Sequence, residues 1–221
     1  MIRIPLMTRA LPLALVAALA LPGAAFAQQA ATPAAATAQA GAPSQLVLAN
    51  SERVLKTLES RRGEFTRDRA ALQRFITGEF DQMFDRDYAA RQVLGRHARG
   101  AADADVKLFG DALAENLMRR YGSSLLDFNT QLRVRIKSET PLPRGLGVRV
   151  SSELLRSGGE PIPVDYLMRQ SGGTWKVFDV MVEGVSFVRT FRDQFDPQLQ
   201  RKSIPDVARE LRSGQIQATA E

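Results

Sequence analysis

Two pairs of carboxylates are the residues whose type and spacing could best support chemistry. One residue separates Asp85 from Asp87, and one residue separates Asp103 from Asp105. Paired acids can act as general acid and base, or as oxygen ligands for a metal ion. Each pair stands where a helix is predicted to begin, and Asp at that position accepts hydrogen bonds from free backbone N–H groups. We therefore interpret both pairs as helix caps.

The rest of the sequence argues against an enzyme. It has no cysteine, which excludes thiol catalysis, disulfides and a lipid-modified cysteine, and its one histidine, His97, is too little for a zinc site or a His-based hydrolase. It also has no glycine-rich phosphate loop, His-Glu-His metal motif or Gly-x-Ser-x-Gly elbow. Ser123 and Ser124 follow a predicted helix end without a base nearby. We expect no catalytic residues, no metal and no cofactor.

The N-terminus has the pattern of a secretory signal. Two arginines precede a short apolar run at 11–21, and Ala25-Phe26-Ala27 is a small-x-small cleavage site. The apolar run is shorter than the ~20 residues needed to span a bilayer. We predict a cleaved signal peptide over 1–27, with an uncleaved anchor as the alternative. Residues 28–44 carry no charge and no aromatic side chain, which predicts a disordered leader.

The net charge of +6 at pH 7 comes mainly from arginine. Guanidinium groups suit bidentate phosphate contacts, but we favour a biased genome composition as the explanation for the many arginines. The basic residues are interleaved with acids and are not clustered, and an exported protein does not meet nucleic acid. We therefore expect no nucleic-acid partner.

Apolar residues recur with helical spacing through the first half of the chain. This spacing predicts helices over Leu46–Ser60, Asp68–Phe84, Asp87–Leu94 and from an N-cap at Asp103 to Tyr121. The period then changes to two, which predicts strands around 132–137, 148–154, 162–170 and 175–182.

Helical spacing returns after the fourth strand. Ser186 has the character of an N-cap, and Phe187, Phe191, Phe195 and Leu199 recur on one helical face. A capping box at 203–206 opens a last helix, which Gly214 ends, and we expect 215–221 to form a frayed tail. The predicted fold is one α+β domain over 45–214. It is a four-stranded antiparallel meander with helices from both ends of the chain packed on one face, enclosing an apolar pocket.

Several separated stretches resemble one known family. They are FDRDYAARQVLG at 84–95, LLDF at 125–128, YLMRQ at 166–170 and WKVFDVMVEGVSFVRTFRDQF at 175–195. In this order they resemble the MlaC, or toluene-tolerance auxiliary, family of periplasmic phospholipid-binding proteins. The resemblance runs from about Leu46 to Leu211, which is nearly all of the expected mature chain.

The resemblance implies a soluble carrier in the periplasm. Proteins of this family hold phospholipid acyl chains between sheet and helices, and they shuttle the lipid between an outer-membrane lipoprotein complex and an inner-membrane ABC transporter complex. This role maintains outer-membrane lipid asymmetry and organic solvent tolerance. For this chain it implies a phospholipid as cargo, no enzymatic activity and, we expect, a monomer. Asp179 lies unusually within a strand, facing either a basic neighbour or a helix cap, and because the family carries an acid there we favour a structural salt bridge.

Alternation and amphipathicity then give candidate residues for the lining of a lipid pocket. They are Leu132, Val134, Ile136, Val148, Val150, Val164, Tyr166, Met168, Phe178, Val180, Phe187 and Phe191. The fourth strand offers an equally apolar alternative face in Trp175, Val177 and Met181. A hydrophobic stripe alone favours an ordinary packed core, since it does not reveal whether a cavity lies behind it. A ligand-free envelope adaptor and a secreted phospholipid hydrolase therefore stay as competing readings, the hydrolase without a visible nucleophile or metal.

Overall fold

The computed structural model describes residues 42–122, 126 and 132–219. The predicted signal peptide, nearly all of the predicted leader, and Ser123 and Ser124 lie outside the described residues, and so do all residues of the LLDF motif except Leu126. Within the described part of the chain, no helix is both long enough and apolar enough to cross a membrane.

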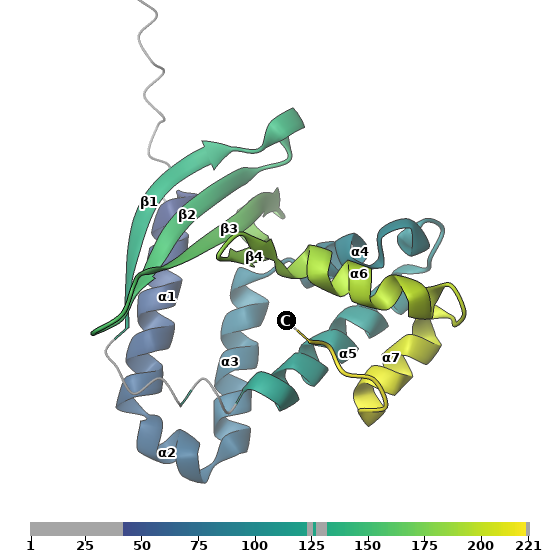
Figure 1. The fold of residues 1–221 in the computed structure, drawn as a ribbon, viewed down its shortest axis with the longest axis horizontal. Helices are drawn as coiled ribbons and strands as arrows, with labels where there is room; N and C mark the ends of the chain where they lie inside the picture. Colours follow the sequence, from purple (N-terminus) through teal and green to yellow (C-terminus); the bar gives the residue numbers. More distant parts are fainter. Residues whose placement is uncertain (1–41, 123–125, 127–131, 220–221) are drawn as a thin grey trace, which may run out of the picture. The chain divides into compact units, whose positions relative to one another are not determined.

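The first three helices form one connected group (Figure 1). They are α1 (Pro43–Ser60), α2 (Arg62–Arg67) and α3 (Arg69–Met83). The sequence pattern did not predict α2, because Arg61-Arg62-Gly63 reads as a helix end. This short helix forms around Phe65, which is fully buried and stacks on Phe75 with ring centroids 5.6 Å apart. Asp68 caps α3 by accepting a hydrogen bond from the Ala71 N–H at 2.9 Å.

The next helices are α4 (Arg86–Leu94), which runs into the 3-10 turn η1 (Gly95–Ala98), and α5 (Asp103–Tyr121). The predicted cap at Asp85 is confirmed, because its carboxylate accepts from the Tyr88 N–H at 3.2 Å. The predicted N-cap at Asp103 is wrong. That position belongs to Ala102, and Asp103 is the first helical residue. There its negative charge interacts favourably with the helix dipole, and its carboxylate pairs with Arg91.

The sheet is an antiparallel meander in the order β1-β2-β3-β4-β5. Its strands are β1 (Arg133–Pro141), β2 (Val148–Leu155), β3 (Ile162–Ser171), β4 (Thr174–Val182) and β5 (Val185–Ser186). The predicted number of four strands is therefore wrong by one. The short β5 pairs with the end of β4 through Val182 and Val185, immediately before the next helix. The antiparallel meander itself is confirmed.

A bulge in β4 explains why its two faces looked equally apolar in sequence. Leu167 pairs with Asp179 while Met168 pairs with Val177, so Phe178 is the extra residue in β4. The bulge reverses the alternation, and Val177 and Val180 therefore belong to one apolar cluster with Met168. Phe178 packs instead against Tyr88 of α4, edge to face at 5.3 Å.

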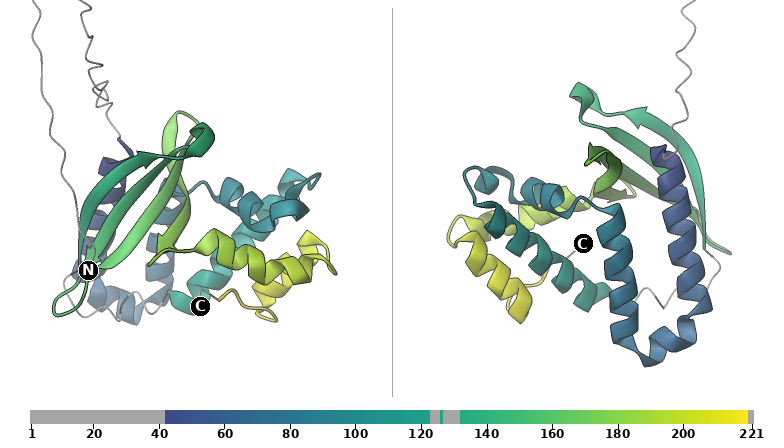
Figure 2. Two further views of the ribbon diagram at one scale, coloured as in Figure 1. Left: turned by 45° about the horizontal axis from the view of Figure 1, so that its top comes forward. Right: turned by 180° about the vertical axis from the view of Figure 1, so that it is seen from behind.

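Helix α1 covers one face of the sheet and closes its core (Figures 1 and 2). Val47 of α1 and Met83 at the end of α3 pack with Val150, Met168 and Val177. Burial of such side chains stabilises the folded protein by about 25 cal/mol per Å² of apolar surface removed from water. This part of the sheet is an ordinary core.

The last helices are α6 (Phe187–Leu199) and α7 (Ile204–Ser213), and with α4 and α5 they share a second core. Phe109 of α5 and Phe195 of α6 meet edge to face at 5.5 Å within it. Ser203 caps α7 as the capping box predicts, accepting from the Asp206 N–H at 3.3 Å. The frayed tail predicted for 215–221 is not seen up to Thr219, the last residue that the structure describes. Ala218 is fully buried, and its N–H donates to Oδ1 of Asn116 at 2.9 Å.

Candidate functional site

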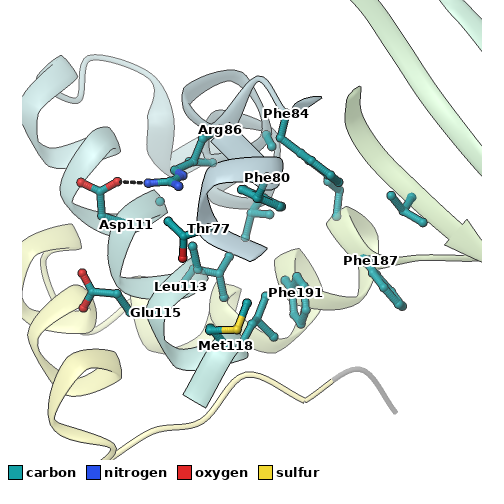
Figure 3. A pocket seen from close by; sticks show the side chains of 18 of the residues that line it. Thr77, Phe80, Phe84, Arg86, Asp111, Leu113, Glu115, Met118, Phe187 and Phe191 are labelled. Atoms are coloured by element: carbon teal, nitrogen blue, oxygen red, sulfur yellow. Dashed lines mark hydrogen bonds and ion pairs between the residues drawn. The ribbon is translucent and has the colours of Figure 1, made fainter. Parts of the chain in front are cut away.

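A cavity of about 850 Å³ lies between α3, α4, α5, α6 and β4 (Figure 3). This volume is near the upper end of the roughly 300–1,000 Å³ typical of ligand pockets. Its lining is mostly apolar and includes Phe80, Phe84, Leu113, Met118 and Phe191. Its walls come from segments that are far apart in the chain, so no single local motif describes it.

The aromatic wall of the cavity is built by the ends of three elements. Phe80 and Phe84, four residues apart at the end of α3, stack with ring centroids 4.0 Å apart. Phe187 and Phe191 stand four residues apart in the first half of α6, with ring centroids 6.1 Å apart. Val180 of β4 joins them. Helical i,i+4 spacing thus places two pairs of rings around one space.

Small residues of α4 and α5 leave the volume empty. Ala89, Gly110 and Ala114 line the cavity where larger side chains would fill it. Gly110 also allows α4 and α5 to approach closely, since a Cβ there would lie 3.1 Å from the Cβ of Ala90. The floor, which includes Val93 and Leu113, belongs to the core of the helical group and gives the cavity a firm base.

Charged side chains gather on the opposite side of the cavity from Phe187 (Figure 3). Arg86 bridges two helices there, donating to Oδ1 of Asp111 on α5 at 2.7 Å and pairing with Asp81 on α3. Lys107 donates to the other oxygen of Asp111 at 2.8 Å. Burial raises the pKa of Asp111, but the hydrogen bonds from Lys107 and Arg86 outweigh burial and leave the pKa below its ordinary value. The Nε of Arg86 is buried and has no hydrogen-bond partner in the described part of the chain.

Asp179 borders the cavity where β4 passes into α6. Its carboxylate accepts from the Ser186 hydroxyl at 2.6 Å and from the Val188 N–H at 3.0 Å, and Ser186 in turn accepts from the Arg189 N–H at 3.0 Å. Burial raises the pKa of Asp179 against the effect of these hydrogen bonds. The alternative prediction for Asp179, a helix cap, is therefore confirmed. The salt bridge that we favoured is not found, because no ion pair among the described residues includes Asp179.

Of the sequence-predicted lining residues, Val180, Phe187 and Phe191 border this cavity. The other nine lie outside its lining. Val150 and Met168 are fully buried in the core beneath α1, with Ile136, Val148 and Tyr166 packed against them. Phe178 contacts Tyr88. Leu132, just before β1, and Val134 and Val164 in the sheet are half-buried and outside the cavity lining.

Sequence reasoning missed the contribution of α3 and α5 to the site. The signal was present, because the apolar surface of α5 is wider than one core requires. Phe109 packs in the helical core, and Leu113 and Leu117 contact both that core and the cavity. Met118 and Tyr121 continue the surface along the cavity. Small residues between these rows were the only sign of empty space. Among the described residues there is also no group of His, Cys, Asp or Glu that could hold a metal ion.

Comparisons with known proteins agree on one group. The family model described as MlaC protein matches residues 49–213. The toluene tolerance protein ttg2D of Pseudomonas putida is 26% identical over 168 residues, which is 75% of this chain and 76% of that protein. A solved structure of the phospholipid-binding protein from Ralstonia solanacearum, in complex with a phospholipid, has a TM-score of 0.68 and 21% identity. The match covers 78% of this chain and 97% of that chain.

Proposed function

Because the chain belongs to the MlaC family, we propose that it is a soluble periplasmic phospholipid carrier. The observation that carries this proposal is the cavity of about 850 Å³ with its mostly apolar lining. The similar Ralstonia protein binds a phospholipid, and its solved structure supports the same cargo here. The acyl chains would occupy the space between α3, α5 and α6, against Phe80, Phe84 and Phe191.

The energetics of acyl chains dictate how such a carrier must work. Each buried CH₂ is worth ~0.8 kcal/mol relative to water, so two chains of about thirty carbons in total would cost roughly 20 kcal/mol if released into solvent. Free release is therefore far too slow. Transfer takes place in docked complexes, with an outer-membrane lipoprotein complex and an inner-membrane ABC transporter complex as the partners. This exchange would maintain outer-membrane lipid asymmetry.

The cavity also supports a role without catalysis. Its charged residues are already engaged within the protein: Arg86 and Lys107 pair with Asp111. Glu115 pairs with Arg212, and Asp179 accepts hydrogen bonds at the start of α6. General acid–base chemistry needs a group free to take or give a proton at the reacting atom. An apolar space bordered by acids and bases that are already engaged favours holding a ligand over reacting with it.

Native mass spectrometry of the mature protein purified from periplasm tests the proposal. We expect a discrete added mass that matches phospholipid and is released on denaturation. The bare polypeptide mass, with no extractable lipid and no uptake from liposomes, would instead support a ligand-free adaptor of the cell envelope.

A cavity-filling variant tests where the lipid lies. Ala114 borders the cavity on α5, and Ala114→Trp should fill part of the space and lower the lipid load severalfold in a folded protein. Ala104→Trp is the matched control, because Ala104 lies on the same helix but is exposed and outside the cavity lining. Equal lipid loads in the two variants would remove this cavity as the site.

A further inference from the structure

A second, polar pocket of about 360 Å³ adjoins the apolar cavity. The two share Phe84, Arg86 and Lys107 in their linings. The remaining residues of the polar pocket are Asp81, Asp85, Asp87, Ser171 and Lys176. An amphiphile with its chains in the apolar cavity therefore has a charged compartment beside it.

The lining of this polar pocket carries as many carboxylates as cations. Asp85 is already engaged, since it caps α4 and pairs with Arg169 at 2.5 Å. Asp81, which also pairs with Arg86, and Asp87 lie at the surface, Asp81 with 53% of its side chain exposed, so a ligand can reach both carboxylates. A compartment with this balance offers little net attraction to an anion.

The cations of the polar pocket keep hydrogen-bond donors to spare. Lys107 donates to Asp111 and Lys176 donates to the carbonyl oxygen of Gln82. An ammonium group has three donors, so each lysine can still donate to phosphate oxygens.

We propose that this polar pocket is a head-group site that selects zwitterionic phospholipids with a primary ammonium, the phosphoethanolamine class. The phosphate lies against Lys107 and Lys176, and the ammonium donates to Asp81 and Asp87. An anionic phosphoglycerol head group leaves the two carboxylates facing hydroxyls. A quaternary trimethylammonium has no N–H to donate. The inference rests on the proposed carrier function, because it places the acyl chains in the adjoining cavity.

Competition among head groups tests the selection. The delipidated protein is loaded from vesicles of equal parts dioleoyl phosphatidylethanolamine, phosphatidylglycerol and phosphatidylcholine, and its extracted cargo is quantified by mass spectrometry. We expect phosphatidylethanolamine to be enriched about two- to fivefold over phosphatidylglycerol, the range of one or two partly exposed charge contacts. The double variant Asp81→Asn/Asp87→Asn should reverse the preference toward phosphatidylglycerol, and the ratio of the two lipids in the extracted cargo measures this.

The control Asp193→Asn removes an exposed carboxylate of α6 that does not line either pocket, and it should keep the wild-type preference. Cargo that mirrors the vesicle composition, or a double variant that keeps the enrichment, overturns the head-group site and leaves the carrier function standing. Absence of any loaded lipid in the wild-type protein overturns both.

Discussion

Two buried or half-buried carboxylates beside the cavity show how partners decide the behaviour of an acid. Asp179 accepts from neutral donors, the Ser186 hydroxyl and the Val188 N–H, and burial raises its pKa. Burial also acts on Asp111, but its donors are the cations Lys107 and Arg86, and its pKa is lowered. Asp179 therefore orders the start of α6, whereas Asp111 holds a charged pair between helices.

The lowered pKa of Asp111 predicts a pH dependence of stability. Its contribution is fully present above the ordinary aspartate pKa of about 3.9 and is lost as the pH falls through the lower pKa of the folded state. We expect Asp111→Asn to lower the unfolding free energy by about 1 kcal/mol at pH 7. The difference from wild type should shrink as the pH falls below about 4 and vanish once Asp111 is protonated in the folded state. Urea titrations across this range measure it, and a difference that persists at low pH would contradict the assignment.

The sequence identified Asp179 as unusual but not its partner. An acid within a strand can meet a cation or a helix N-terminus, and only the position of α6 decides between them. Ser186 was predictable as a cap, because Ser before a helical apolar stripe is a local signal. The hydrogen bond that joins Ser186 to Asp179 depends on how β5 turns the chain back, which is not local.

Among the elements, the helices with a strong apolar period were predictable and the irregular ones were not. The stripes of α1, α3, α5 and α6 follow from spacing alone. The bulge at Phe178 could not be predicted, because it is defined by the pairing of β4 with β3. It explains why Val177 and Val180 share a face although alternation separates them.

Two helical glycines give a test of how closely the elements pack. Gly78 in α3 is exposed, with open space where a Cβ would stand, whereas a Cβ on Gly110 in α5 would lie 3.1 Å from that of Ala90. We expect Gly78→Ala to raise the unfolding free energy by about 0.5–1 kcal/mol through helix propensity. Gly110→Ala should leave the unfolding free energy unchanged or lower it, because α4 must shift to make room for the new methyl group. Thermal and urea unfolding of both variants measure this, and equal gains would show that α4 and α5 are not in tight contact.

For the whole molecule, the α+β class and the antiparallel meander were predictable, but the position of the cavity was not. We predicted that most of the pocket-lining residues would lie on the inner face of the sheet. Val47 of α1 fills that space and makes it core. Apolar residues that face a neighbour and those that face a void look the same in sequence, and the difference lies in how far the helices stand apart.

A filled cavity should also stabilise the whole domain. A ligand that binds the folded state alone raises the unfolding free energy by RT ln(1 + [L]/Kd), which is about 2.7 kcal/mol at a hundredfold excess over Kd. We expect delipidated protein to melt several degrees lower than loaded protein, and reloading from vesicles to restore the melting temperature. The Ala114→Trp variant should respond much less. A melting temperature that is independent of lipid in the wild type would argue against the cavity as a binding site.

The contact between the start of α1 and the far end of β1 sets the order in which the chain can fold. The N–H of Ser44 donates to Glu139 at 3.0 Å, across 95 residues of sequence, and α1 has its apolar face on strands made after it. At a synthesis rate of about 5–20 residues per second, the helix waits roughly five to twenty seconds for its first partner strand. During that interval its apolar side chains are open to chaperones and proteases. For a chain expected to be exported, this delay is an advantage, because an unfolded polypeptide can be threaded through the translocation pore.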